Sequence, residues 1–161
     1  MAIFPVPRWI DTYSYEVSPR SFGSARAGGR KHAGCDLYAP LGSEIKAVAA
    51  GKVTRVATFY WGTFAIEVEH PGIGVIRYGE VTVAPGIAGN MLVAEGQTIA
   101  FIAQLVNPNP SGTNPHPMLH FEMYSGSGSG LLTTAAVPYK RRSDLVNPTD
   151  FLNSVIGACT P

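Results

Sequence analysis

The sequence predicts an all-β fold built from many short strands. The chain has 161 residues, with 18 glycines and 13 prolines, so turns must be frequent and long helices are disfavoured. Residues 63–69 alternate apolar and polar side chains, which is the pattern of a strand buried on one face. A turn-rich segment at 70–74 separates this strand from a second one at 75–83. The two segments are therefore expected to form a hairpin, in which His70 is a surface turn residue.

The other elements are predicted from short runs bounded by glycine or proline. Proline-rich residues 107–115 exclude regular structure and form a loop that leads into a strand. Asn147 and Pro148 have the signature of a helix start, so one short C-terminal helix is expected. Two strands are predicted at 45–50 and 52–58, which meet at a bend at Gly51. The remaining strands are predicted at 98–103 and 118–124.

Composition and charge exclude several classes of protein. Charged residues make up 14% of the chain and the net charge is +1, which gives no basic stripe for a nucleic-acid partner. No segment reaches the roughly 18–20 apolar residues of a membrane span. The first eight residues lack a charged region followed by an apolar run, so no classical signal peptide is expected. A chain of this length suits a single domain.

The last predicted strand and an upstream loop carry a candidate metal site. In that strand, period-two alternation places His120 on the face opposite Leu119 and Phe121, which can pack on a core. His32 and Asp36 lie far upstream, around a glycine. Two histidines and one aspartate form the three-ligand set of a zinc site that keeps one position open for water.

The two cysteines are not part of this candidate site. Cys35 lies between His32 and Asp36, but in an extended segment it faces away from its neighbours and is expected in the core. Whether it pairs with Cys159, the only other cysteine, is left open.

Several motifs resemble those of the M23 peptidases, also called lysostaphin-type or LytM-type zinc metallopeptidases. Residues 32–36 read His-Ala-Gly-Cys-Asp and fit the family's His-x-Gly-x-Asp motif, and 119–122 resemble the end of its His-x-His-Phe-Glu motif. Further similar stretches are Ser21-Phe22-Gly23, Ala39-Pro40-Leu41-Gly42 with residues 47–53, Glu95 to Ala100, and Asn147 to Leu152.

The resemblance implies a fold, a metal and a division of the chain. The fold would be an antiparallel β-sheet or sandwich of the LytM type, with long loops around a groove and a short C-terminal helix. One Zn²⁺ would be held by His32, Asp36 and His120. Residues 21–161 would form the peptidase domain, and residues 1–20 an N-terminal extension packed on it.

The sequence departs from the family pattern at the catalytic positions. Glu80 stands where a Tyr-x-His motif has its histidine, and Met118, whose thioether is a poor base, stands where His-x-His has its first histidine. Two replacements are open: Glu80 as general base, or His116 bent back over the metal. Each is otherwise a solvated side chain. Tyr78 would share a strand face with Glu80 and stabilise the transition state.

The resemblance implies a zinc-dependent endopeptidase that cuts the peptide cross-links of peptidoglycan. The stem peptides would be its partners, and its place of action the periplasm or cell wall. Because no classical signal peptide is expected, delivery would depend on a phage or on a secretion system. A phage tail component, a secretion-system component or an immunity protein would then be a further partner. The alternative is a degenerate relative that binds cell-wall peptide or activates another hydrolase without cutting.

Overall fold

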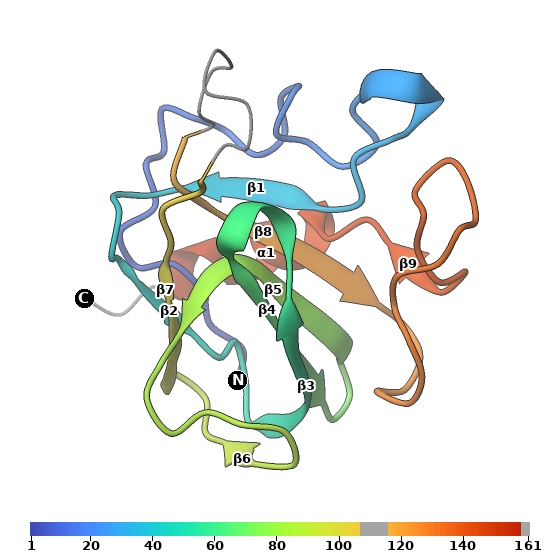
Figure 1. Cartoon of the computed structure of the whole chain (residues 1–161). Helices are drawn as coiled ribbons and strands as arrows, with labels where there is room; N and C mark the ends of the chain where they lie inside the picture. Colours follow the sequence, from blue (N-terminus) through green and yellow to red (C-terminus); the bar gives the residue numbers. More distant parts are fainter. Residues whose placement is uncertain (107–115, 159–161) are drawn as a thin grey trace.

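The fold, obtained as a computed structural model that describes residues 1–106 and 116–158, is one antiparallel β-sheet with a short helix near its C-terminus (Figure 1). This confirms the predicted fold class. The described residues form strands β1 (Cys35–Tyr38), β2 (Glu44–Lys46), β3 (Gly51–Thr58), β4 (Phe64–His70), β5 (Gly74–Val83), β6 (Leu92–Val93), β7 (Thr98–Ile102), β8 (Met118–Tyr124) and β9 (Leu145–Val146), helix α1 (Thr149–Val155), and 3₁₀ turns η1 (Ala27–Gly29), η2 (Tyr60–Gly62) and η3 (Ile156–Ala158).

The long strand β5 lies at the centre of the sheet. The main path runs β1-β8-β5-β4-β3-β6, while β2 joins through β7, which pairs with β5, and β9 adds to β8. Every pair is antiparallel. The hairpin expected around residues 70–74 is therefore the β4–β5 hairpin, and the predicted strands at 98–103 and 118–124 are β7 and β8.

Strand β5 changes its partner at Glu80. From Val75 to Gly79 it pairs with β8, and from Val81 onward it pairs with β7. On its other side, β4 skips Glu80, because Phe64 faces Val81 while Ala65 faces Gly79. Glu80 is thus the extra residue of a β-bulge, and it has a left-handed φ of 63°. A bulge re-aims the side chain of the extra residue, which places Glu80 outside the ordinary alternation of the strand.

The hydrophobic core lies between the sheet, α1 and the N-terminal residues. Leu119 and Phe121 of β8 are fully buried there, and Phe151 of α1 stacks on Phe121 at 6.1 Å between ring centroids. This confirms the face of β8 that alternation assigns to the core. The first 20 residues contribute further buried side chains to the same cluster, namely Phe4, Val6 and Tyr15.

The N-terminal residues also cover the free edge of the sheet. Strand β1 is an edge strand, and its outer backbone groups would be open to water or to another chain. The Asp36 amide instead donates to the Arg20 carbonyl at 3.0 Å, and the Ile10 amide donates to the Tyr38 carbonyl at 2.9 Å. The strand that carries Asp36 is therefore held on both sides.

Two local expectations are wrong. The strand expected at 45–50 does not reach Gly51, because β2 ends at Lys46 and residues 47–50 belong to no strand, while β3 begins at Gly51 itself. His70 is not a surface residue but is 1% exposed, because its ring lies between the Ala50 carbonyl and the Tyr78 hydroxyl, at 3.2 and 3.1 Å.

Further expectations concern the C-terminal helix, the proline-rich loop and the cysteines. Helix α1 begins where expected, and the Asn147 side chain accepts a hydrogen bond from the Thr149 amide at 3.0 Å. The predicted loop at 107–115 and Cys159 lie outside the described residues, while Cys35 is buried as expected. Across the described part of the chain, no helix is both long and apolar enough to span a membrane.

Truncation of the core ring on β8 tests this packing. Phe121→Ala is expected to lower the free energy of unfolding by about 3–5 kcal/mol, because it leaves a cavity beneath α1. Phe64→Ala serves as control, since Phe64 is 41% exposed on β4, and should cost less than about 1.5 kcal/mol. Equilibrium unfolding in urea measures both. Equal losses for the two variants would contradict the placement of the core.

Candidate functional site

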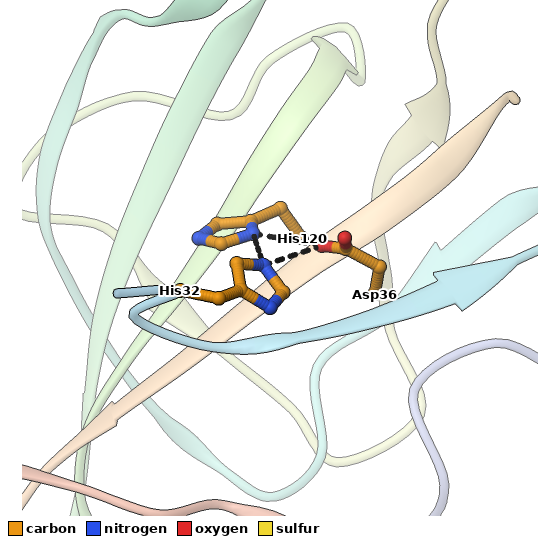
Figure 2. Close-up of side chains that lie close together, drawn as sticks. All are labelled: His32, Asp36 and His120. Carbon is orange, nitrogen blue, oxygen red and sulfur yellow. Dashed lines mark hydrogen bonds and ion pairs between the residues drawn. The ribbon is translucent and has the colours of Figure 1, made fainter. Parts of the chain in front are cut away.

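Asp36 and His120 are brought together by the pairing of β1 with β8. The antiparallel register places them directly opposite each other, although they are far apart in the sequence. His120 Nδ1 is 2.9 Å from Asp36 Oδ1. His32, in the loop before β1, turns back so that its Nε2 is 3.0 Å from Asp36 Oδ1 and 3.1 Å from His120 Nδ1. The three atoms form a nearly equilateral triangle (Figure 2).

The glycine between His32 and Asp36 is required by close packing. The backbone of Gly34 passes so near β8 that a Cβ atom there would lie 2.3 Å from the Phe121 carbonyl oxygen. Any larger residue would push this loop away from β8. The spacing His-x-Gly-x-Asp therefore lets the loop lie flat enough for His32 to reach His120.

The outer nitrogen of each imidazole is held by a hydrogen-bond acceptor. His32 Nδ1 donates to the Ser21 carbonyl at 2.9 Å, and His120 Nε2 donates to Glu122 Oε1 at 2.8 Å. In a neutral imidazole, these bonds leave the lone pair on His32 Nε2 and on His120 Nδ1. Both lone pairs then face the Asp36 carboxylate. Anchoring of this kind is typical of metal-binding histidines.

Three acceptor atoms in contact require positive charge between them. Burial disfavours ionisation of these groups, but the hydrogen bonds between Asp36 and the two imidazoles lower the pKa of Asp36. Burial also opposes protonation of His120, yet the carboxylates of Asp36 and Glu122 raise its pKa. A proton can therefore supply the charge when no metal does, and a metal ion would displace it.

The donor set and its dimensions fit Zn²⁺. Two neutral imidazoles and one carboxylate are ligands that zinc accepts, and three protein ligands leave the fourth position open. Neighbouring ligand atoms at tetrahedral zinc are about 3.3 Å apart for bonds of ~2.0–2.1 Å. The observed separations of 2.9–3.1 Å need only a small expansion. His32, Asp36 and His120 are the residues that could hold the ion.

A network of buried ion pairs holds the imidazole of His120 in its orientation. Glu122 is fully buried, and its Oε1 accepts from Arg141 at 2.8 Å as well as from His120. Its Oε2 accepts from Arg77 at 3.2 Å, and Arg77 also binds Glu67 at 2.9 Å. Burial alone would raise the pKa of Glu122, but His120 and the two guanidinium groups hold it well below its usual range. The carboxylate that orients His120 is therefore kept ionised.

Glu80 shares a pocket with the three candidate ligands. The bulge directs it away from the core and into a pocket of about 360 Å³. Its Oε2 atom is buried and has no hydrogen-bond partner among the described residues. Burial raises the pKa of Glu80 to about 7, with smaller effects from neighbouring charges. The pocket is lined by Arg26, Arg30, Lys31, His32, Ala33, Asp36, Tyr60, Trp61, Glu80, Leu105, Met118, His120, Tyr139 and Arg141.

A larger groove of about 940 Å³ lies elsewhere, between the β4–β5 turn, β6 and residues 125–127. His70 is its only histidine, and its ring is already bonded to the Tyr78 hydroxyl and the Ala50 carbonyl. None of the candidate site residues lines this groove. The smaller pocket is therefore the candidate site, because it collects the groups that can do chemistry.

The structure does not bring Tyr78 into the pocket. Its ring is fully buried in the core, and its hydroxyl accepts from the Val48 amide at 3.0 Å and contacts His70. The expectation that Tyr78 and Glu80 share a face is wrong, because the bulge at Glu80 breaks the alternation between them. Tyr78 therefore packs in the hydrophobic core and is not placed to contact a substrate in the pocket.

His116 is also held away from the candidate ligands. Its ring stacks on Tyr38 at 4.9 Å and contacts Tyr13 in a tilted arrangement at 5.5 Å, and it is not among the residues that line the pocket. Strand β8 pairs in regular register with β1 from Met118 onward, so Met118 is not part of a bulge that could bend His116 over the candidate ligands. Of the two replacement bases, only Glu80 is placed beside the candidate ligands.

Several pocket residues escape sequence-based reasoning. Arg141 stands in a run of three basic residues, and nothing in the local pattern separates it from its neighbours. Tyr60 belongs to the turn between β3 and β4, and its ring contacts Phe59, which in turn lies 5.9 Å from the His120 ring. Exposed aromatic residues in such a turn are the only signal that could have drawn attention to it.

Solved structures with a similar fold include peptidases. The catalytic domain of the antimicrobial peptidase lysostaphin from Staphylococcus simulans aligns with a TM-score of 0.59 and 21% identity, covering 83% of this chain and 89% of that one. LytU aligns with a TM-score of 0.62 and 22% identity, covering 91% of each chain. A zinc-containing peptidase from Vibrio cholerae aligns at 0.51 and 22%, covering 75% of this chain and 36% of that one.

The family assignment comes from the sequence itself. No curated protein sequence matches this chain significantly. The model of "Peptidase family M23" matches residues 30–131, which is more than half of the chain and includes both motifs that supply the candidate ligands. The chain therefore belongs to peptidase family M23.

Proposed function

We propose that this protein is a zinc-dependent endopeptidase that hydrolyses the peptide cross-links of bacterial peptidoglycan. One observation carries the proposal: three acceptor atoms that need a cation converge 2.9–3.1 Å apart, in the same pocket as Glu80, whose Oε2 is buried and has no hydrogen-bond partner among the described residues. Family membership and the fold shared with the antimicrobial peptidase lysostaphin support a peptidase, and peptidoglycan is the substrate that the resemblance of the motifs implies.

His32, Asp36 and His120 would hold the ion through Nε2, Oδ1 and Nδ1. When bound, Zn²⁺ supplies Lewis acidity, which acidifies water in the open position and polarises a carbonyl group. Glu122 fixes the ring of His120 by accepting its second N–H, and Ser21 does the same for His32. These contacts keep both lone pairs directed at the same point.

Glu80 would act as general base and then as general acid. Its free Oε2 can accept a proton from the attacking water and return it to the amine nitrogen as the peptide bond breaks. A buried carboxylate oxygen with no partner among the described residues is costly for folding, so its retention beside the proposed ligands suits a catalytic role. Tyr60 replaces Tyr78 as the proposed donor to the developing oxyanion, because its hydroxyl-bearing ring lines the pocket.

The proposed ligands are tested by direct metal binding. Chelator-treated protein should bind one Zn²⁺ per chain in isothermal titration calorimetry and gain thermal stability. His32→Ala and His120→Ala should each weaken zinc binding by more than about 100-fold, since they remove a ligand rather than its support. His116→Ala is the matched control and should bind zinc like the wild type. Unchanged zinc affinity in His32→Ala would exclude the site.

Glu80→Gln tests the proposed reaction. The zinc-loaded variant should bind the metal as tightly as the wild type but hydrolyse cross-linked muropeptides about 10²–10⁴-fold more slowly, because it lacks the proton acceptor. Glu95→Gln, at an exposed carboxylate away from the pocket, should retain the full rate. If wild-type protein leaves the cross-links intact with zinc present while still binding them, the chain is a peptide-binding relative rather than an enzyme.

His116→Ala separates the two candidate bases. Because the ring of His116 stacks on Tyr38 outside the pocket, its removal should change kcat by less than about threefold, far below the loss expected for a general base. Steady-state hydrolysis of the same muropeptides measures this. A loss comparable to that of Glu80→Gln would return His116 to the mechanism and require the strand to bend in the complex with substrate.

A further inference from the structure

A structured loop of basic residues forms one side of the pocket. Residues 25–31, called the basic loop here, are closed by a β-bridge between Ala25 and Lys31, and the Arg26 amide donates to the Arg30 carbonyl at 2.9 Å. The turn is made by Gly28 and Gly29, whose φ values of 71° and 72° favour glycine. The loop is thus held in one shape immediately before the candidate ligand His32.

The basic loop presents three cations to the pocket. Arg26, Arg30 and Lys31 all line it. Arg26 is already engaged, since its guanidinium donates to the Pro19 carbonyl at 2.8 Å and lies 3.6 Å from Asp36 Oδ2. Among the residues that the structure describes, the Arg30 side chain donates only within the loop, to the Ala27 carbonyl at 3.3 Å. Among the described residues, no carboxylate lies within ion-pair distance of Arg30 or Lys31.

Some charged groups around the pocket have an oppositely charged partner, whereas Arg30 and Lys31 have none among the described residues. The carboxylate of Asp36 faces the two imidazoles, and the guanidinium of Arg141 is neutralised by buried Glu122. Neither carboxylate, Asp36 or Glu122, lies within ion-pair distance of Arg30 or Lys31. These two cations line a pocket in which a bound metal would add further positive charge. An anionic group on the ligand would fill this role, and a guanidinium binds a carboxylate through a planar fork.

We propose that Arg30 and Lys31 bind a free carboxylate that the peptide substrate carries beside the scissile bond. This inference rests on the proposed function, which supplies the assumption that the ligand is a peptide. It adds a requirement that the metal ligands do not impose, namely that the peptide be anionic on the side that faces the basic loop. Arg26 positions the loop against Pro19 and is not part of the binding pair.

A pair of matched peptides tests the proposal by binding alone. Two fluorescent cross-linked peptides are compared that differ only in one side-chain group beside the scissile bond, a carboxylate or a carboxamide. Zinc-loaded Glu80→Gln protein, used to suppress turnover, should bind the carboxylate peptide roughly three- to tenfold more tightly in fluorescence anisotropy. This preference should shrink in 0.5 M NaCl, because the two cations are near the surface.

Variants of the basic loop supply the decisive comparison. The double variant Arg30→Gln with Lys31→Gln should lose the preference while binding the carboxamide peptide as before. Lys52→Gln, at an exposed lysine of the other groove, is the control and should keep the preference. Circular dichroism and thermal melting check that each variant is folded.

The result also separates this inference from the proposed reaction. Equal affinities for the two peptides, no measurable binding of either one, or an equal loss in Lys52→Gln would overturn the carboxylate site. Hydrolysis is not measured in these experiments, so an inactive protein would still show the preference. Conversely, an active enzyme without the preference would leave the zinc-dependent reaction standing.

Discussion

The site depends on one constraint: three electron-pair donors are forced into contact and require a cation. Asp36 and His120 are opposed by the register of β1 and β8, and His32 is added by a loop that lies flat only because Gly34 has no side chain. The outer nitrogens of both imidazoles are committed to Ser21 and Glu122. The rings therefore cannot turn away, and the cluster is stable only with a proton or a metal ion at its centre.

The scaffold makes this arrangement rigid at a considerable electrostatic cost. Glu122 is fully buried beneath His120, and its charge is compensated by His120 and by the guanidinium groups of Arg77 and Arg141. Removing one partner of such a network leaves an unpaired charge in a dry environment. Because Arg77 also binds Glu67 on β4, the orientation of His120 is tied to the neighbouring strands of the sheet. The geometry of the candidate metal site is therefore coupled to the packing of the sheet.

Sequence reasoning succeeds where the signal is local and periodic. Alternation along β8 places His120 opposite the core, and the turn at 70–74 gives the β4–β5 hairpin. The short apolar runs also give the all-β class and the terminal helix. The two motifs identify His32, Asp36 and His120, which the register of β1 and β8 then brings together.

The errors arise where geometry depends on distant partners. Alternation places Tyr78 and Glu80 on one face, but β5 changes from β8 to β7 between Gly79 and Val81, and this exchange produces the bulge. His70 is at the end of a strand, where a turn residue is expected, yet the Tyr78 hydroxyl and the Ala50 carbonyl enclose it. Arg141 reaches the pocket through Glu122, a partner 19 residues away that no local pattern reveals.

The bulge at Glu80 has a consequence for how such a protein can diversify. The left-handed conformation excludes branched side chains there, but glycine, asparagine, aspartate and histidine adopt it readily. The histidine expected from related motifs and the glutamate of this chain can thus occupy one backbone position without any change in strand pairing. Exchange of the proposed proton-accepting group, or its loss to glycine, would alter reactivity while leaving the sheet and the candidate metal ligands in place.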